Sequence, residues 1–197
     1  ACGEEGSEED PINQANVLAA IVEYENYLVT PSPFDRWLEG YDDALTQDQK
    51  DGLRAFVSVG CTACHDGRNV GGNRYQVLGL VNDYFERRGG EITEVDRGRF
   101  NVTNDEGDMH KFKVPTLRNI ALTSPYFHDG HEETLEGAVR TMAHVQLGRE
   151  LTDDQVSDIV AFLGSLTGEL PPEARLAEAA DDAEGEGDDA EATEEEG

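Results

Sequence analysis

Residues 61–65 read Cys-Thr-Ala-Cys-His, the C-x-x-C-H pattern that marks covalent attachment of a c-type haem. Two thiols three positions apart can each add to one vinyl group of a porphyrin, and the histidine after them can direct its imidazole toward the iron. A redox C-x-x-C is less favoured because it normally lies in a βαβ context, which we do not find. A zinc site would need two further cysteine or histidine ligands at suitable spacing. Because the motif occurs once, we expect one haem.

The segments around the motif predict an all-α, cytochrome c-like helical domain with long haem-wrapping loops. Apolar residues recur at helical spacing in several stretches. Predicted helices cover 16–29, a short helix from the capping box at 46–49 to Gly60, 134–146, and a last helix from the capping box at 152–155 to Leu166. Residues 66–111 read as irregular loops with a helical turn near 80–87, and no strand-like alternation is evident. A loop this long argues against an assignment unless a cofactor supplies the missing core.

Haem iron needs a second axial ligand or an open position, and the sequence offers several candidates. They are Met109, Met142, His110, His128, His131 and His144. Met109 lies in a polar loop, where an apolar side chain is costly. Met142 lies on the apolar face of a predicted helix, where core packing is the plain explanation. Spacing alone therefore does not clearly favour either methionine as the axial ligand.

Composition excludes several classes of function. With 43 acidic and 15 basic residues, the formal charge of −28 is far too negative for a nucleic-acid-backbone binder. The longest apolar stretch is too short to span a bilayer, and three cysteines cannot form a disulfide framework. The acidic residues are concentrated near the two ends of the sequence. This distribution predicts a flexible acidic linker over 1–15, a cytochrome c domain over 16–176 and a disordered acidic tail over 177–197.

Four longer stretches resemble the C-terminal haem domain of bacterial dihaem cytochrome c peroxidases, the family that also holds the MauG-type enzymes. They are LVTPSPFDRWLEG (28–40), GCTACHDGRNVGG (60–72), FKVPTLRNIALTSPYFHDG (112–130) and AVRTMAHVQLGRELTDDQVSDIVAFLGSLTGELP (138–171). In that family this domain carries the high-potential, electron-accepting haem. The resemblance implies that Met142 is the distal ligand, opposite His65, and that the iron has His/Met ligation.

The chain also departs from the family pattern. Family members carry a second C-x-x-C-H in an N-terminal domain, whose haem cleaves peroxide, and this sequence has no second motif. The resemblance maps interdomain calcium ligands onto Thr123 and Pro125, but the other domain's share is absent, so calcium is doubtful. Arg118 could bind a haem propionate, with a structural salt bridge as the alternative. The other histidines, His128 included, are not expected to ligate iron.

The third cysteine, Cys2, precedes a polar stretch in the manner of a lipidated bacterial lipoprotein cysteine. We expect it to anchor the protein to a membrane by lipid rather than by a spanning helix, with a free or intermolecular thiol as the alternative. Haem attachment fits this expectation, because it also places the protein outside the cytoplasm, in the periplasm.

The favoured function is that of a monohaem c-type cytochrome that exchanges electrons with redox partner proteins. It could be a subunit of a larger membrane-associated respiratory or photosynthetic assembly. The alternative is a peroxidase that reduces hydrogen peroxide, alone or with a partner that supplies the peroxidatic haem. The acidic tail could steer a basic partner, although solubility and spacing are the slightly favoured explanation.

Overall fold

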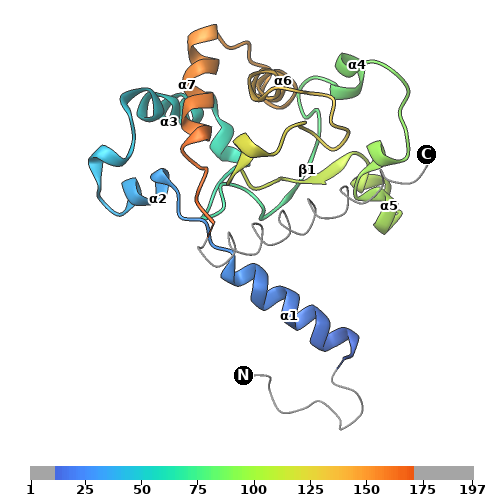
Figure 1. Ribbon diagram of the computed structural model, residues 1–197. Coiled ribbons are helices and arrows are strands. Elements are labelled where there is room, and N and C mark those ends of the chain that lie inside the picture. Colours follow the sequence, from blue (N-terminus) through green and yellow to red (C-terminus); the bar gives the residue numbers. More distant parts are fainter. Residues whose placement is uncertain (1–11, 171–197) are drawn as a thin grey trace, which may run out of the picture. The chain divides into compact units, whose positions relative to one another are not determined.

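The computed structural model describes residues 12–170, which divide into two units. The larger unit, Pro31–Gly168, contains the haem-attachment motif (Figure 1). The other described residues, 12–30 and 169–170, belong to the second unit. Within the described part of the chain, no helix is long and apolar enough to cross a membrane.

The second unit contains helix α1, Gln14–Tyr27, which matches the helix predicted over 16–29. Asn13 caps it by accepting a hydrogen bond from the backbone N–H of Asn16 at 3.0 Å. No residue of α1 is buried, although much of its surface is apolar. The predicted domain over 16–176 encloses the larger unit, whereas Cys2 and the tail over 177–197 lie outside the described residues.

Two capped helices form the framework of the larger unit. Helix α3, Gln47–Val59, and helix α7, Asp153–Gly164, both begin where the sequence predicted a capping box. In each box the cap threonine accepts from the third helical N–H, and a glutamine side chain accepts from the cap N–H in return. The two capping-box predictions are therefore confirmed, although α7 ends at Gly164, two residues earlier than expected.

Helices α3 and α7 pack against each other at unusually close range because of one glycine. A Cβ atom at Gly52 of α3 would lie 1.8 Å from the backbone oxygen of Asp158 in α7. Only a residue without a side chain permits that approach. Both helices contribute to the main core, whose buried side chains are Phe56, Val59, Val70, Leu117, Ile159, Phe162, Leu163 and Leu166.

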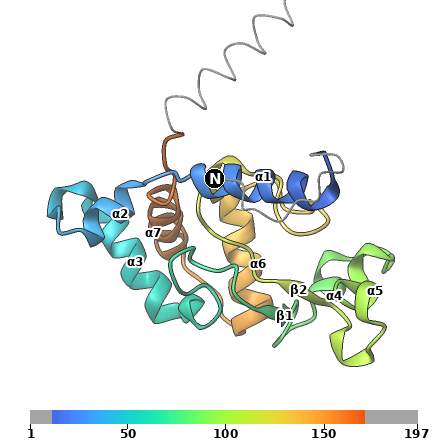
Figure 2. The ribbon, with the colours of Figure 1, turned by 90° about the horizontal axis from the view of Figure 1, so that it is seen from below.

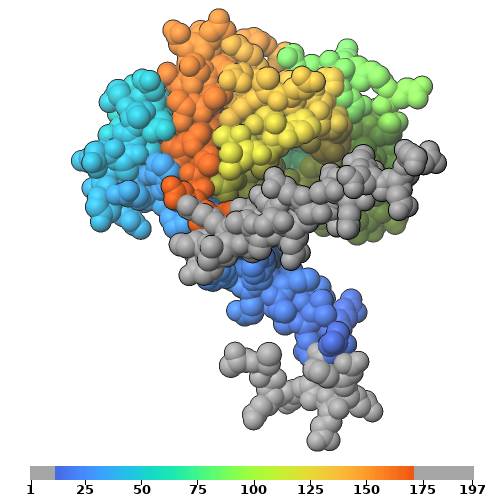
Figure 3. Space-filling model, viewed as in Figure 1, coloured from blue at the N-terminus to red at the C-terminus, as the bar shows by residue number. Residues whose placement is uncertain are grey.

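Helix α6, Leu135–Leu147, lies on the other side of α7, so that α7 stands between α3 and α6 (Figures 1, 2 and 3). Thr134 caps its start by accepting from the N–H of Gly137 at 3.1 Å. Gly148 ends it in the left-handed conformation with φ of 61°. The predicted helix over 134–146 is confirmed within one residue at each end.

The sequence patterns did not reveal helix α2, Pro33–Leu38. From the sequence, Pro31 and Pro33 predict only that the preceding helix does not continue through them. Pro33 is instead the first residue of α2, a position where its missing N–H costs nothing. Ser32 caps the helix in a reciprocal box with Asp35, which completes a helix start that the prolines obscured.

The long segment between the motif and α6 is mostly loop, as predicted, with a few short elements. These are strands β1 (Tyr75–Val77) and β2 (Lys111–Lys113), which pair antiparallel, and helices α4 (Tyr84–Arg88) and α5 (Phe100–Thr103). The small sheet corrects the expectation of no strands, because three residues are too few to show alternation. Helix α4 confirms the turn expected near 80–87, and the helical fold class is confirmed as a whole.

Candidate haem site

The cysteine motif follows directly from the end of α3. Gly60 ends the helix in the left-handed conformation, with φ of 108°, and its N–H donates to the Phe56 carbonyl. The next residues form a 3-10 turn, in which the backbone N–H groups of Cys64 and His65 donate to the carbonyl of Cys61 at 3.2 and 3.0 Å. This compact turn fixes both cysteines and the histidine on one short, rigid segment.

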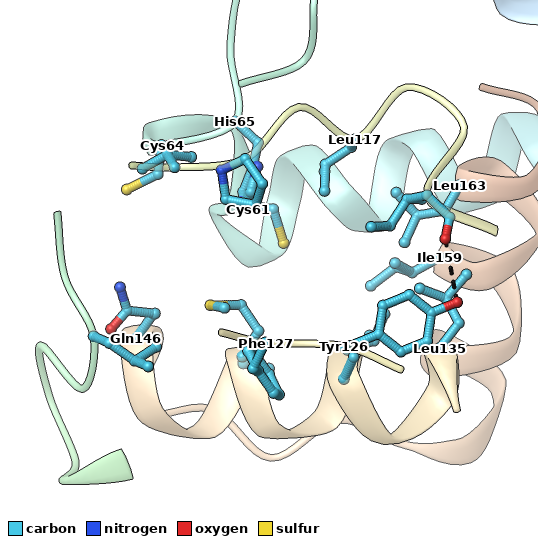
Figure 4. Close-up of a pocket in the computed structure, with 18 of the residues that line it drawn as sticks. Cys61, Cys64, His65, Leu117, Tyr126, Phe127, Leu135, Gln146, Ile159 and Leu163 are labelled. Carbon is cyan, nitrogen blue, oxygen red and sulfur yellow. Dashed lines mark hydrogen bonds between the residues drawn. The ribbon is translucent and has the colours of Figure 1, made fainter. Parts of the chain in front are cut away.

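A cavity of about 600 Å³ lies directly against this segment. Figure 4 shows Cys61, Cys64 and His65 on one side of it, and Gln146, Phe127, Tyr126 and Leu135 on the other. The sulfur of Cys61 points into the space between the two sides. Side chains from α6, α7 and the loops make the rest of the lining mostly apolar, which suits a flat, apolar prosthetic group.

Helix α6 supplies the wall that faces the motif. Its residues Leu135, Ala138, Val139, Met142 and Gln146 all line the cavity, and their three- and four-residue spacing places them on one face of the helix. The structure thus brings Met142 to the same cavity as His65, as the family resemblance implied. Met109, the other candidate methionine, is not part of this lining and caps a 3-10 turn elsewhere.

His65 is held as a neutral ring. Burial lowers its pKa, and the nearby carbonyls of Val70 and Pro115 oppose that shift only in part. The buried Nδ1 atom makes no hydrogen bond of ordinary geometry within the described residues. Gly71, with φ of 126°, allows close approach here, because a Cβ would lie 2.1 Å from the Pro115 oxygen and 3.3 Å from this Nδ1. A neutral imidazole is the form that binds a metal ion.

The first cysteine of the motif is largely withdrawn from solvent. Burial raises the pKa of the Cys61 thiol to about 11. Cys61 and Cys64 are not joined in a disulfide. These two thiols, the neutral His65 and the thioether of Met142 are a donor set that fits a covalently attached haem with two axial ligands.

Gln146 has a second role beside lining the cavity. Its side-chain oxygen accepts hydrogen bonds from the N–H groups of Gly79 and Leu80, both at 2.8 Å. Its amide nitrogen donates to the carbonyl of Val77 at 3.0 Å. Gln146 lies one turn after Met142 in α6. Its hydrogen bonds therefore hold the helix that carries the methionine to the end of β1 and the loop that follows this strand. The only sequence signal for this role is the four-residue spacing between Met142 and Gln146.

Two further sequence candidates, Arg118 and His144, are not part of the cavity lining. The guanidinium of Arg118 bonds both carboxylate oxygens of Asp35 at 2.7 Å and donates to the Arg68 carbonyl. That is the structural salt bridge considered as its alternative role, and pairing of Arg118 with a haem propionate stays a prediction. His144 contacts Glu150 on the surface of α6.

His110 and His128 converge on a residue that sequence reasoning did not single out, Asp96. Nδ1 of His110 donates to the Asp96 carbonyl, and Nε2 of His128 donates to its carboxylate, both at 2.7 Å. Only His128 of the two also lines the cavity. No sequence pattern marks Asp96, because it lies in a three-residue 3-10 turn, Val95–Arg97, far along the chain from His128.

Comparisons with known proteins identify one group of relatives. No protein-family model matches the chain. It is 50% identical over 167 residues to the cytochrome c551 peroxidase of Nitrosomonas europaea, an overlap of 84% of this chain and 48% of that protein. It is 50% identical over 158 residues to the cytochrome c peroxidase Ccp of Escherichia coli, which is 80% of this chain and 33% of that protein. The chain thus spans a third to a half of the length of these curated relatives.

The fold leads to the same group of proteins. A solved MauG-like protein associated with microbial copper homeostasis matches with a TM-score of 0.66 and 27% identity, over 82% of this chain and 55% of that one. The chain spans only part of the length of these relatives. It belongs to the family of bacterial haem proteins that holds the cytochrome c peroxidases and MauG.

Proposed function

We propose that this chain is a monohaem c-type cytochrome that transfers electrons. Cys61 and Cys64 attach one haem c, and His65 and Met142 are its axial ligands. The observation that carries the proposal is the arrangement of these four residues around one cavity, with the motif on one wall and α6 on the other. Bound there, the haem would supply reversible one-electron chemistry between ferric and ferrous iron.

The residues of the chain suit that chemistry in separate ways. The neutral His65 offers a lone pair without first losing a proton. The thioether of Met142 is a soft ligand that favours ferrous iron and so raises the reduction potential. Apolar side chains from α6 and α7 exclude water from the cavity, which limits rearrangement when the charge on the iron changes.

The test is the spectrum of the ferric, haem-loaded protein. Six-coordinate, low-spin iron with the weak far-red sulfur-to-iron band is expected, together with haem that stays on the polypeptide in a denaturing gel. A five-coordinate, high-spin ferric spectrum, or haem that separates from the chain on denaturation, contradicts the proposal.

The second candidate function is peroxide reduction, either by this haem after release of Met142 or with a partner that supplies a peroxidatic haem. The 50% sequence identity to two proteins named as peroxidases favours this function. The match to only part of their length favours the form in which a partner supplies the peroxidatic haem. It predicts turnover of hydrogen peroxide with an added electron donor. If fully haem-loaded protein shows no turnover, with or without a candidate partner, this function is dismissed.

For location and partners, we propose the periplasm, a lipid anchor at Cys2, and redox partner proteins that include a larger membrane assembly. Covalent c-type haem is the support for an extracytoplasmic site. Intact-mass analysis of protein purified from membranes checks the anchor, since diacylation adds the mass of two fatty chains. An unmodified Cys2 removes the anchor from the proposal and leaves the haem chemistry unaffected.

A further inference from the structure

A buried ionic cluster lies behind the cavity wall that contains His128. The Asp96 carboxylate, which has no exposed surface, accepts from the guanidinium of Arg88 at 2.8 and 3.2 Å and from Nε2 of His128 at 2.7 Å. Arg88 also donates to Asp129 at 2.8 Å, and the hydroxyl of Tyr84 donates to Asp129 at 2.9 Å. We call Arg88, Asp96, His128 and Asp129 the Arg88 cluster.

The Arg88 cluster is not a metal site, although three of its groups lie close enough for one. One ligand atom each from Asp96, His128 and Asp129 falls within 4.8 Å of the others. The guanidinium of Arg88 already supplies positive charge to both carboxylates, and it is wedged over the ring of Phe85 with 5.4 Å between the guanidinium carbon and the ring centre. An additional cation would have to displace this side chain.

His128 connects the Arg88 cluster to the cavity. Its ring stacks on Phe112 with 4.3 Å between centres and 30° between planes, and both residues line the cavity. Because Asp96 accepts from Nε2, that nitrogen carries a proton. The other nitrogen, Nδ1, is buried and has no hydrogen-bond partner among the described residues. A second proton there would be an unpaired donor, so the geometry favours a neutral ring.

The Arg88 cluster then carries a net charge of minus one. The hydrogen bonds from Arg88 are the main cause that holds the pKa of Asp96 far below its usual range. Burial alone would raise the pKa of Asp129, but hydrogen bonds from Arg88, the His131 N–H and Tyr84 outweigh it, so this pKa is lowered too. Two ionised carboxylates against one guanidinium leave one uncompensated negative charge in a poorly solvated place.

We propose that the net negative charge of the Arg88 cluster lowers the reduction potential of the haem. Asp96, Asp129 and Arg88 act through their charges, and His128 holds Asp96 against the cavity wall. Reduction adds one electron from a redox partner to the iron, and a buried negative charge behind the cavity wall opposes its arrival. This inference rests on the proposed haem attachment and adds to it which residues tune the potential and in which direction.

The test is a spectroelectrochemical titration of three haem-loaded variants. Asp96→Asn and Asp129→Asn each remove one negative charge with little change of shape, so both raise the potential. Arg88→Gln removes the positive charge and lowers it. Loss of packing alone would admit water to the cavity and move all three in the same direction. The opposite signs are therefore a result that a merely structural role does not give.

Two controls accompany the titration. Asp51→Asn removes a carboxylate of an exposed pair with Arg54, whose side chains are 44% and 67% exposed, and leaves the potential unchanged. The ferric spectrum and the covalent haem content of each variant confirm that ligation is intact. If Arg88→Gln does not fold, Arg88→Lys replaces it and shifts the potential no more than Asp51→Asn does.

Two results overturn the inference: a common direction of shift in all charge-removing variants, or an unchanged or lower potential in both asparagine variants with intact haem. Absence of covalent haem in the unsubstituted protein is a different result. It contradicts the proposed function, so the two failures are distinguishable.

Discussion

Substitution of Gly52 by alanine tests the close approach of α3 and α7 that supports the haem site. The new methyl carbon would lie 1.8 Å from the backbone oxygen of Asp158 and 2.6 Å from its carbonyl carbon. Ordinary contact begins near 3.4 Å, so the two helices must separate by roughly 1.5 Å or the helix must deform. These two atoms of Asp158 belong to the backbone, which cannot rotate away as a flexible side chain can.

The expected cost follows from two opposing effects. Overpacking a core contact costs about 1–3 kcal/mol, and a backbone clash of this size belongs at the upper end. Replacing a helical glycine by alanine returns about 1 kcal/mol through backbone entropy. The net loss is about 2 kcal/mol, which lowers the melting temperature of a domain of this size by roughly 5–10 °C.

Urea denaturation followed by circular dichroism measures this loss, and Gly164→Ala is the matched control. Gly164 is also helical, in α7, but a Cβ there would meet no atom within 4 Å. That variant should be unchanged or stabilised by up to about 1 kcal/mol. If Gly52→Ala is as stable as the unsubstituted protein, the close approach does not exist in solution and the reasoning is refuted. Lower covalent haem content in Gly52→Ala is a second expected result, because α3 leads into the motif.

Four other outcomes are expected. Met142→Ala should abolish the far-red sulfur-to-iron band, whereas Met109→Ala should retain it; loss of the band in the second variant alone would reverse the assignment. In folded haem-free protein at pH 8, only about one Cys61 thiol in a thousand is ionised, given its pKa of about 11, so alkylation should be slower than in the denatured chain. The lowered pKa of Asp96 gives stability that is present above pH 4 and lost as pH falls further, so the stability difference between Asp96→Asn and the unsubstituted protein should shrink in acid. Arg118→Ala should cost about 1–3 kcal/mol in urea denaturation, because it leaves Oδ1 of the partly buried Asp35 carboxylate and the Arg68 carbonyl without their donor.

Signals that depend on nearby residues predicted the fold well. Each capping box places its partners three positions apart, so the starts of α3 and α7 were readable from the sequence. Helix α2 is hard to predict from the sequence because Pro33, its first residue, is of a type that also commonly ends a helix. The hairpin of β1 and β2 was missed because its strands are three residues long and 33 positions separate them, so no local pattern marks the pair.

The site divides in the same way. The motif over 61–65 is contiguous and predicts the haem-attaching residues directly. Spacing could not separate Met142 from Met109, and the family resemblance was needed to prefer the first; the structure then placed Met142 in the cavity lining. The Arg88 cluster joins residues 8 to 41 positions apart through irregular loops. Such contacts follow from tertiary packing alone and leave no trace in hydrophobic periodicity.

If Met142 ligates the haem iron as proposed, the three hydrogen bonds of Gln146 restrict how the methionine could leave the iron. Its amide takes the place of a peptide group for Val77, Gly79 and Leu80, so α6 cannot slide along its axis without breaking all three bonds. Release of Met142 by movement of the whole helix is therefore costly. The side chain has three rotatable bonds of its own, however, and can swing aside while the helix stays in place. Ligand exchange at this site is then a local rotation, whose rate the surrounding side chains set rather than the opening of the domain.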